Sequence, residues 1–135
     1  MRIEELSVGD WVRTTDDDIR GSRECIIQSI ERWSNGDVLV VRFKDGGIET
    51  LGIGCFAPIP LTTEILEKNG FVKNGEYDEW NIGTWETPYL LGVSLERPAI
   101  TIKWNGSSVF IDQAKCVHQL QHALRLAGVE KEIVL

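Results

Sequence analysis

The sequence predicts an α+β protein that is mainly β: an N-terminal SH3-like small barrel, then a short helix, an antiparallel sheet and a C-terminal helix packed on that sheet. Two observations carry this prediction. Short apolar runs rich in β-branched residues alternate with turn sequences, among them the Asn-Gly pairs that begin at Asn35 and Asn105. Helical periodicity is confined to two segments, at residues 64–69 and 116–127.

The barrel is expected in residues 1–58. A turn at residues 8–12 leads into a first strand, and a polar loop follows at residues 14–23. Further strands are predicted at residues 25–33, 38–43 and 48–53. Several short strands joined by tight turns are typical of small barrels.

The Pro58-Ile59-Pro60-Leu61 segment is the predicted domain boundary, because two prolines so close together stiffen a connector and fit poorly inside a sheet. We therefore expect two domains, an SH3-like β-barrel at residues 1–58 and a small α+β domain at residues 61–135 that ends in a helix. In this reading the two domains share a core.

The second domain begins with a predicted helix at residues 64–69, which Thr62 or Thr63 caps and Gly70 ends. Strands are predicted at residues 89–95, 99–104 and 107–111. The segment at residues 74–87 carries neither a helical nor a strand pattern and is left without an element.

The last helix has the clearest pattern in the chain, with one apolar face. Asp112 or Gln113 is the expected cap, and Gly128 follows the last periodic residue. Residues 129–135 end on apolar side chains, so we expect this tail to dock, as a short strand. The apolar face of the helix is made by the following residues: Val117, Leu120, Leu124 and Ala127.

Composition favours a cytoplasmic globular protein. No apolar run approaches the roughly 20 residues that a membrane span needs, and the first residues lack a signal-peptide pattern. Three widely spaced cysteines indicate buried thiols in a reducing compartment. The net charge of −7 argues against nucleic acid as a partner. A local basic face could still form from five arginines, namely Arg13, Arg20, Arg23, Arg32 and Arg42.

Two segments, residues 60–71 and 117–121, resemble paired elements in a family of small proteins from Bacteroides-type gut bacteria and their phages and prophages. Members combine a Leu-Thr-x-Glu helix that ends near Gly-Phe with a C-terminal Val-His-x-Leu-Gln helix, often after a short β module. The resemblance implies a cytoplasmic protein of such a bacterium or its mobile elements. It carries over no activity, cofactor or catalytic residue.

The sequence predicts no enzyme, no metal site and no cofactor. His118 and His122 have a metal-binding spacing, but a zinc site needs a third ligand, residue 119 is Gln rather than Glu, and Cys116 lies on a neighbouring helix face. Both histidines lie on one predicted helix, and no Gly-x-Ser-x-Gly elbow or phosphate-binding loop is present. A cluster of carboxylates is read as solvated surface rather than as a catalytic pair: Glu76, Asp78, Glu79 and Glu86.

Aromatic side chains gather in the unassigned stretch and at its end, and two interpretations remain open for them. They fold back into the core, as large aromatics usually do, or they form an exposed interaction surface. The residues of this predicted surface are Tyr77, Trp80, Trp85 and Tyr89.

The functional prediction is a non-enzymatic protein–protein interaction module, a bacterial or prophage accessory protein. It would dock an unidentified protein partner through these exposed aromatics or through a groove of the barrel. The alternative is a nucleic-acid-binding accessory protein that uses the SH3-like barrel. Both rest on analogy at the level of the fold.

Overall fold

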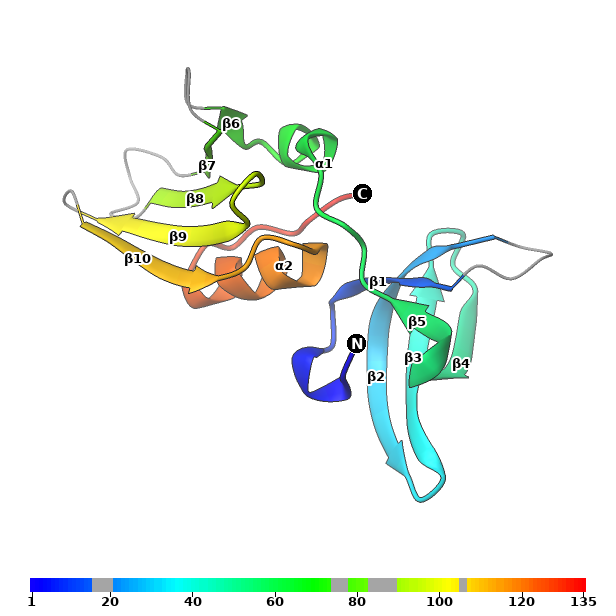
Figure 1. Cartoon of the computed structure of the whole chain (residues 1–135). Helices are drawn as coiled ribbons and strands as arrows, with labels where there is room; N and C mark the ends of the chain where they lie inside the picture. Colours follow the sequence, from blue (N-terminus) through cyan, green and yellow to red (C-terminus); the bar gives the residue numbers. More distant parts are fainter. Residues whose placement is uncertain (16–20, 74–77, 83–89, 105–106) are drawn as a thin grey trace. The chain divides into compact units, whose positions relative to one another are not determined.

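Two five-stranded antiparallel sheets and one C-terminal helix dominate the computed structural model (Figure 1), which confirms the predicted mainly β, α+β class. The structure describes residues 1–15, 21–73, 78–82, 90–104 and 107–135. The chain divides into two units, Met1–Ile59 and Pro60–Leu135, so the break falls within the proline-rich segment. No helix among the described residues is both long and apolar enough to cross a membrane.

The N-terminal unit is a meander with the strand order β4-β3-β2-β1-β5. The 3-10 turn η1 (Ile3–Glu5) precedes the sheet, and a second one, η2 (Ile53–Cys55), separates its last two strands. The strands are β1 (Trp11–Thr14), β2 (Glu24–Trp33), β3 (Gly36–Phe43), β4 (Ile48–Gly52) and β5 (Phe56–Ala57).

One face of this sheet carries the apolar core. Val12 lies opposite Cys25, and Cys25 lies opposite Phe43, so alternate residues of three strands point to the same side. The pairing of β2 with β3 shifts by one residue between Ile27 and Ser29. Beyond this shift, Ile30 lies opposite the buried Leu39.

The predicted SH3-like barrel is not confirmed, because the sheet does not close. Within the described residues β4 pairs with β3 alone and β5 pairs with β1 alone, which leaves two edges. After Gly52 the chain leaves the sheet through η2, and β5 is only two residues long. A strand that short offers too few backbone groups to join the two edges.

The C-terminal unit is a second meander with the order β10-β9-β8-β7-β6. The sequence predicted three of its strands and missed the two shortest, β6 and β7, because two or three residues show no alternation. The strands are β6 (Val72–Lys73), β7 (Trp80–Ile82), β8 (Leu90–Ser94), β9 (Ala99–Trp104) and β10 (Ser107–Asp112).

Helix α1 (Thr63–Lys68) opens this unit and follows the predicted capping. The backbone N–H of Ile65 donates to the Thr62 hydroxyl at 3.3 Å. Gly70 follows the helix with φ of 84°, a conformation that residues with a Cβ rarely adopt.

Helix α2 (Val117–Leu126) begins later than either predicted cap allows. Asp112 belongs to β10, so its side chain lies too early in the chain to serve the helix. Cys116 is the N-cap instead, and its backbone N–H donates to Gln119 Oε1 at 3.2 Å. The predicted apolar face is buried at Val117, Leu120 and Leu124.

The C-terminal tail docks, as expected, but not as a strand. Residues 129–135 form no regular element, yet Ile133 is only 2% exposed. Val134 is hydrogen-bonded in both directions to the side chain of Asn69, which caps the C-terminal end of α1. The tail is therefore held by a side chain rather than by a strand ladder.

Candidate functional site

Of the two interpretations left open for the aromatic side chains, the core interpretation holds for Trp80, the one member that the structure describes. Trp80 is only 5% exposed in β7, where it lies opposite Val93, and Val93 lies opposite Ile100. All three belong to the apolar face of the C-terminal sheet, so the indole contributes to the core and not to an exposed contact. Tyr77, Trp85 and Tyr89 lie outside the described residues.

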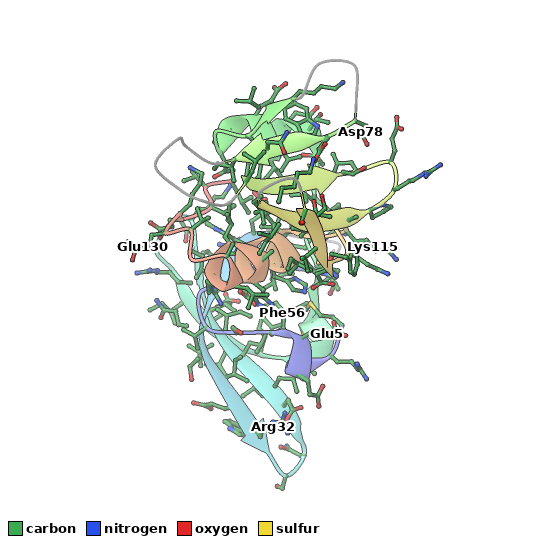
Figure 2. The ribbon with its side chains drawn as sticks, turned by 90° about the vertical axis from the view of Figure 1, so that its left-hand side faces the viewer. Glu5, Arg32, Phe56, Asp78, Lys115 and Glu130 are labelled. Atoms are coloured by element: carbon green, nitrogen blue, oxygen red, sulfur yellow. The ribbon has the colours of Figure 1, made fainter. Side chains whose placement is uncertain are left out.

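The arginines do not form a single basic face. Arg32 lies near the end of β2, beside the turn to β3 (Figure 2). Arg23 precedes β2, so about 30 Å of extended chain separates the two arginines. Each faces a carboxylate, Arg23 at 3.3 Å from Asp45 and Arg32 at 3.7 Å from Glu4. The remaining members, Arg13 and Arg42, occupy alternate positions that point to the other side of the sheet, and Arg20 lies outside the described residues.

The described carboxylates of the acidic cluster have separate roles. Asp78 Oδ2 accepts hydrogen bonds from the backbone N–H groups of Leu95 and Glu96, at 3.2 and 2.8 Å, and so holds the turn between β8 and β9. Glu79 forms an ion pair with Lys103. Glu76 and Glu86 lie outside the described residues.

The two histidines are neighbours on α2. Their ring centroids are 5.8 Å apart, and both ring nitrogens of the buried His118 lie 3.5 Å from Cys116 Sγ. In the part of the chain that the structure describes, no group of three His, Cys, Asp or Glu side chains is placed to hold a metal ion. This corner of the fold is packed rather than open.

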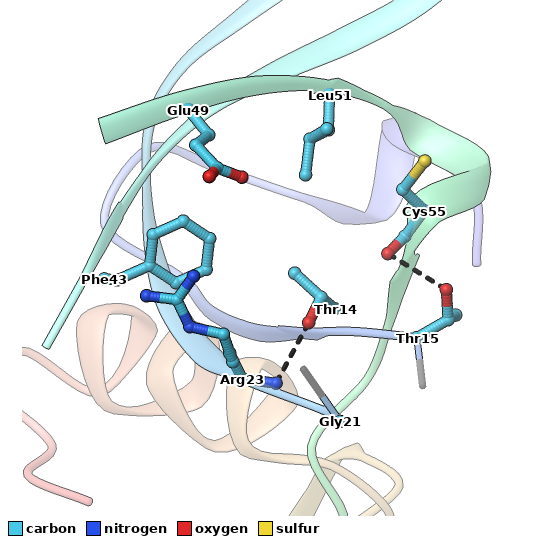
Figure 3. A pocket seen from close by; sticks show the side chains of 8 residues that line it. All are labelled: Thr14, Thr15, Gly21, Arg23, Phe43, Glu49, Leu51 and Cys55. Carbon is cyan, nitrogen blue, oxygen red and sulfur yellow. Dashed lines mark hydrogen bonds between the residues drawn. The ribbon is translucent and has the colours of Figure 1, made fainter. Parts of the chain in front are cut away.

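A hollow of about 250 Å³ lies at one end of the N-terminal sheet (Figure 3), and we call it the N-terminal groove. It draws residues from β1, the loop before β2, and strands β3 and β4, together with η2. Its lining residues are Thr14, Thr15, Gly21, Arg23, Phe43, Glu49, Leu51 and Cys55.

Strand register explains why polar groups gather here. Glu49 lies opposite the buried Val41, and Leu51 lies opposite the buried Leu39. The groove is thus a continuation of the core face, at the end where the side chains become polar. Arg23 closes one wall, with its guanidinium carbon 3.8 Å from the centroid of the Phe43 ring.

Two hydrogen bonds donated by backbone N–H groups hold together the segments that line the groove. The Thr15 N–H donates to the Cys55 carbonyl at 2.9 Å, and the Arg23 N–H donates to the Thr14 hydroxyl at 2.9 Å. The Cys55 thiol is exposed, whereas the other two cysteines of the chain are buried. The groove therefore combines an apolar floor, one guanidinium, one carboxylate and one accessible thiol.

Cys25 belongs to the buried layer beside these residues. Burial raises the pKa of its thiol to about 12, with a further increase from the charge of Glu49 that the charge of Arg23 opposes. It stays a neutral thiol and is not a nucleophile at physiological pH.

The sequence predicted a groove of the expected barrel as one of two docking places and identified no residues for it, so docking at this hollow stays a prediction. Glu49 and Leu51 alternate in a strand like any half-buried pair, and nothing local marks them as a site. The comparisons with protein-family models, with curated proteins and with solved structures found no match for this chain.

Proposed function

We propose that this chain is a non-enzymatic interaction module that binds an extended segment of a partner protein along β4, with one of its side chains in the N-terminal groove. The observation that carries the proposal is that Glu49 and Leu51 line the groove and also belong to a sheet edge. Peptide segments commonly bind in this way, by adding a strand to an exposed edge.

The outer edge of β4 is suited to binding an extended segment of a partner. Within the described residues β4 has a neighbouring strand on one side only, so its other side offers backbone groups to an added strand. Alternate side chains of such a strand would face the groove side of the sheet, next to Glu49 and Leu51. Backbone pairing supplies affinity, and the groove supplies selectivity.

Charge favours a basic partner. Residues 1–58 hold 11 acidic and 7 basic side chains, and the whole chain has a net charge of −7. A basic segment would associate faster with such a surface and fit it better than an acidic one. The groove adds a selective feature, because the apolar Phe43 and Leu51 lie beside the Glu49 carboxylate.

The resemblance of residues 60–71 and 117–121 leads us to expect a partner among the proteins of Bacteroides-type bacteria or their phages, and a cytoplasmic module. None of the three cysteines, all of which the structure describes, is in a disulfide, and this agrees with a reducing compartment.

Site-specific photocrosslinking tests the proposal. Benzoylphenylalanine is introduced at Leu51, which lines the groove, or at the exposed Thr50, which points to the other face of the same strand. Both proteins are irradiated in a Bacteroides-type lysate, with and without nuclease, and the crosslinked segment is sequenced. A synthetic peptide of that segment is then titrated against the original protein and a Leu51→Asp variant.

Support requires three results: a protein adduct at position 51 and not at 50, persistence after nuclease, and weaker peptide binding by Leu51→Asp. Equal adducts at both positions would show contact without a groove, and the proposal would fail. Adducts that vanish with nuclease would favour the alternative of a nucleic-acid-binding accessory protein, for which salt-sensitive binding to oligonucleotides is the direct measurement.

A further inference from the structure

The C-terminal sheet has a polar face on the side away from its apolar core face. Register places one residue from each of its five strands in a single row across this face. The two end positions are exposed apolar side chains, and the middle is polar. In order from β6 to β10, the row is Val72, Asn81, Gly92, Thr101 and Phe110.

Gly92 forms the floor of a hollow of about 410 Å³ on this face, which we call the Gly92 hollow. A Cβ at this position would lie 2.7 Å from Glu79 Oε1, 3.0 Å from Thr101 Oγ1 and 3.3 Å from Asn81 Oδ1. Three oxygen atoms from separate parts of the chain therefore converge above one glycine. The absence of a side chain is what lets them approach each other.

Among the described residues, one of these oxygens lacks a donor. Asn81 Oδ1 is buried and has no hydrogen-bond partner among the described residues, which is an unusual and costly state for a buried polar atom. Lys103 also lines the hollow, but its ammonium group pairs with Glu79 and leaves Asn81 unsatisfied. The Glu79–Lys103 pair shows that an ammonium group fits beside this carboxylate.

We propose that the Gly92 hollow binds a primary ammonium group of a ligand. Such a group carries three N–H donors, and the hollow presents three acceptors: the Glu79 carboxylate, the Asn81 amide oxygen and the Thr101 hydroxyl. A bound ammonium displaces Lys103 from Glu79 and supplies the donor that Asn81 lacks. The same chemistry occurs in a free amine and in a lysine side chain of a protein.

This site is independent of the N-terminal groove, because it is built wholly from residues of the C-terminal unit. Failure of either proposal leaves the other standing.

The test is a titration followed by ¹⁵N NMR, with methylammonium chloride as the probe and tetramethylammonium chloride as the control. Both cations carry one positive charge, but only methylammonium donates N–H hydrogen bonds. We expect saturable shifts at the Asn81 side-chain amide and the Gly92 backbone N–H with methylammonium alone. Equal shifts with both salts, or no saturation at high millimolar concentration, would overturn the proposal.

The Kd for methylammonium is then compared in three variants. Gly92→Ala forces the Glu79 carboxylate away and is expected to raise the Kd for methylammonium by about tenfold. Ser108→Ala removes another lining hydroxyl that lies outside the three acceptors and should leave the Kd unchanged. Lys103→Met removes the internal competitor and should lower the Kd. A higher Kd in Lys103→Met, or an unchanged Kd in Gly92→Ala, would contradict the assignment.

The source of the ammonium is resolved by two further titrations, one with free L-lysine and one with a short peptide whose only amine is a lysine side chain. Tighter binding of the peptide assigns the hollow to a protein partner, and tighter binding of the free amino acid assigns it to a small molecule. Both results support the site, and failure of both ligands to compete with methylammonium would overturn it.

Discussion

Asn69 and Val134 lie 65 residues apart in the chain and are joined by two hydrogen bonds. Asn69 Nδ2 donates to the Val134 carbonyl at 2.8 Å, and the Val134 N–H donates to Asn69 Oδ1 at 2.7 Å. Asn69 Nδ2 also donates to the Ile65 carbonyl at 2.8 Å, so one buried amide holds the end of α1 and the C-terminal tail together.

Replacing Asn69 tests this clamp. Asn69→Ala removes the hydrogen-bond partner of both the N–H and the carbonyl of Val134, and we expect it to lower the free energy of unfolding by about 2 kcal/mol. Urea denaturation measures the change, and hydrogen exchange should show faster exchange at the Val134 N–H. The neighbouring Glu67→Ala, at an exposed position, is the control. Equal stability of the two variants would contradict the role of the clamp.

The position of Trp80 predicts a structural role. Trp80→Ala should lower the free energy of unfolding by about 3–5 kcal/mol, because it leaves a large cavity in the C-terminal core. Trp80→Phe should cost much less, since the indole Nε1 has no hydrogen-bond partner among the described residues. Trp33→Ala serves as the control, at a tryptophan that is 54% exposed. Similar losses in Trp80→Ala and Trp33→Ala would show that Trp80 is not core.

Loss of the Thr62 cap of α1 is expected to change both the stability of the protein and the pKa of Glu64. The pKa of the exposed Glu64 is lowered by a hydrogen bond from its own backbone N–H and by the hydroxyls of Thr62 and Thr63. Glu64 therefore stabilises the fold above its ordinary pKa of about 4.5, and that stabilisation is lost as the pH falls through the lowered value. Thr62→Ala should raise the pKa of Glu64, measured by NMR titration, and should cost about 1 kcal/mol of stability. An unchanged pKa would argue against the contribution of the Thr62 hydroxyl.

Cys25 predicts a loss of stability in alkali. Its thiol has a pKa of about 12 in the fold, against about 9 in the unfolded chain. Between these two values the unfolded state releases a proton that the folded state keeps, so stability falls as the pH rises. We expect a slope of about 1.4 kcal/mol per pH unit in this window.

The measurement is urea denaturation from pH 8 to pH 11, on the original protein and on Cys25→Ala. The variant is less stable at neutral pH because it loses buried atoms, but the difference between the two proteins should shrink as the pH rises. Other groups titrate in the same range and cancel in the comparison. A constant difference across the series would contradict the raised pKa.

Thiol reactivity reports on the N-terminal groove directly. Only Cys55 is exposed among the three cysteines, so one thiol should react rapidly with a colorimetric disulfide reagent in the native protein and three after denaturation. Cys55→Ser should abolish the rapid reaction. A peptide that occupies the groove should slow it. Rapid reaction of two or more native thiols would show that Cys25 or Cys116 is accessible.

Local patterns were sufficient for the longer elements. The Asn-Gly turn that begins at Asn35 joins β2 to β3, and the apolar face of α2 is buried where its periodicity placed it. These features depend on residues close in sequence, so composition and spacing are enough to predict them. Strands β6 and β7 were missed because a strand of two or three residues exists only through its neighbour in the sheet.

The candidate sites could not be predicted in the same way. Trp80 is core because Val93 and Ile100 lie on the same face, and register is a property of the whole sheet. Arg23 lies over Phe43 because β2 and β3 pair in the observed register, although the two residues stand 20 positions apart.

The sequence alone determined the mainly β class, the helix positions, the proline-rich break and the acidic charge, since each follows from composition or from contacts between near neighbours. The tertiary structure alone decided that the N-terminal sheet stays open, that Trp80 is buried, and that Glu79, Asn81 and Thr101 converge above Gly92. These depend on which strands pair and in what register. Pairing is set by the burial of whole faces, and no short stretch of residues encodes that.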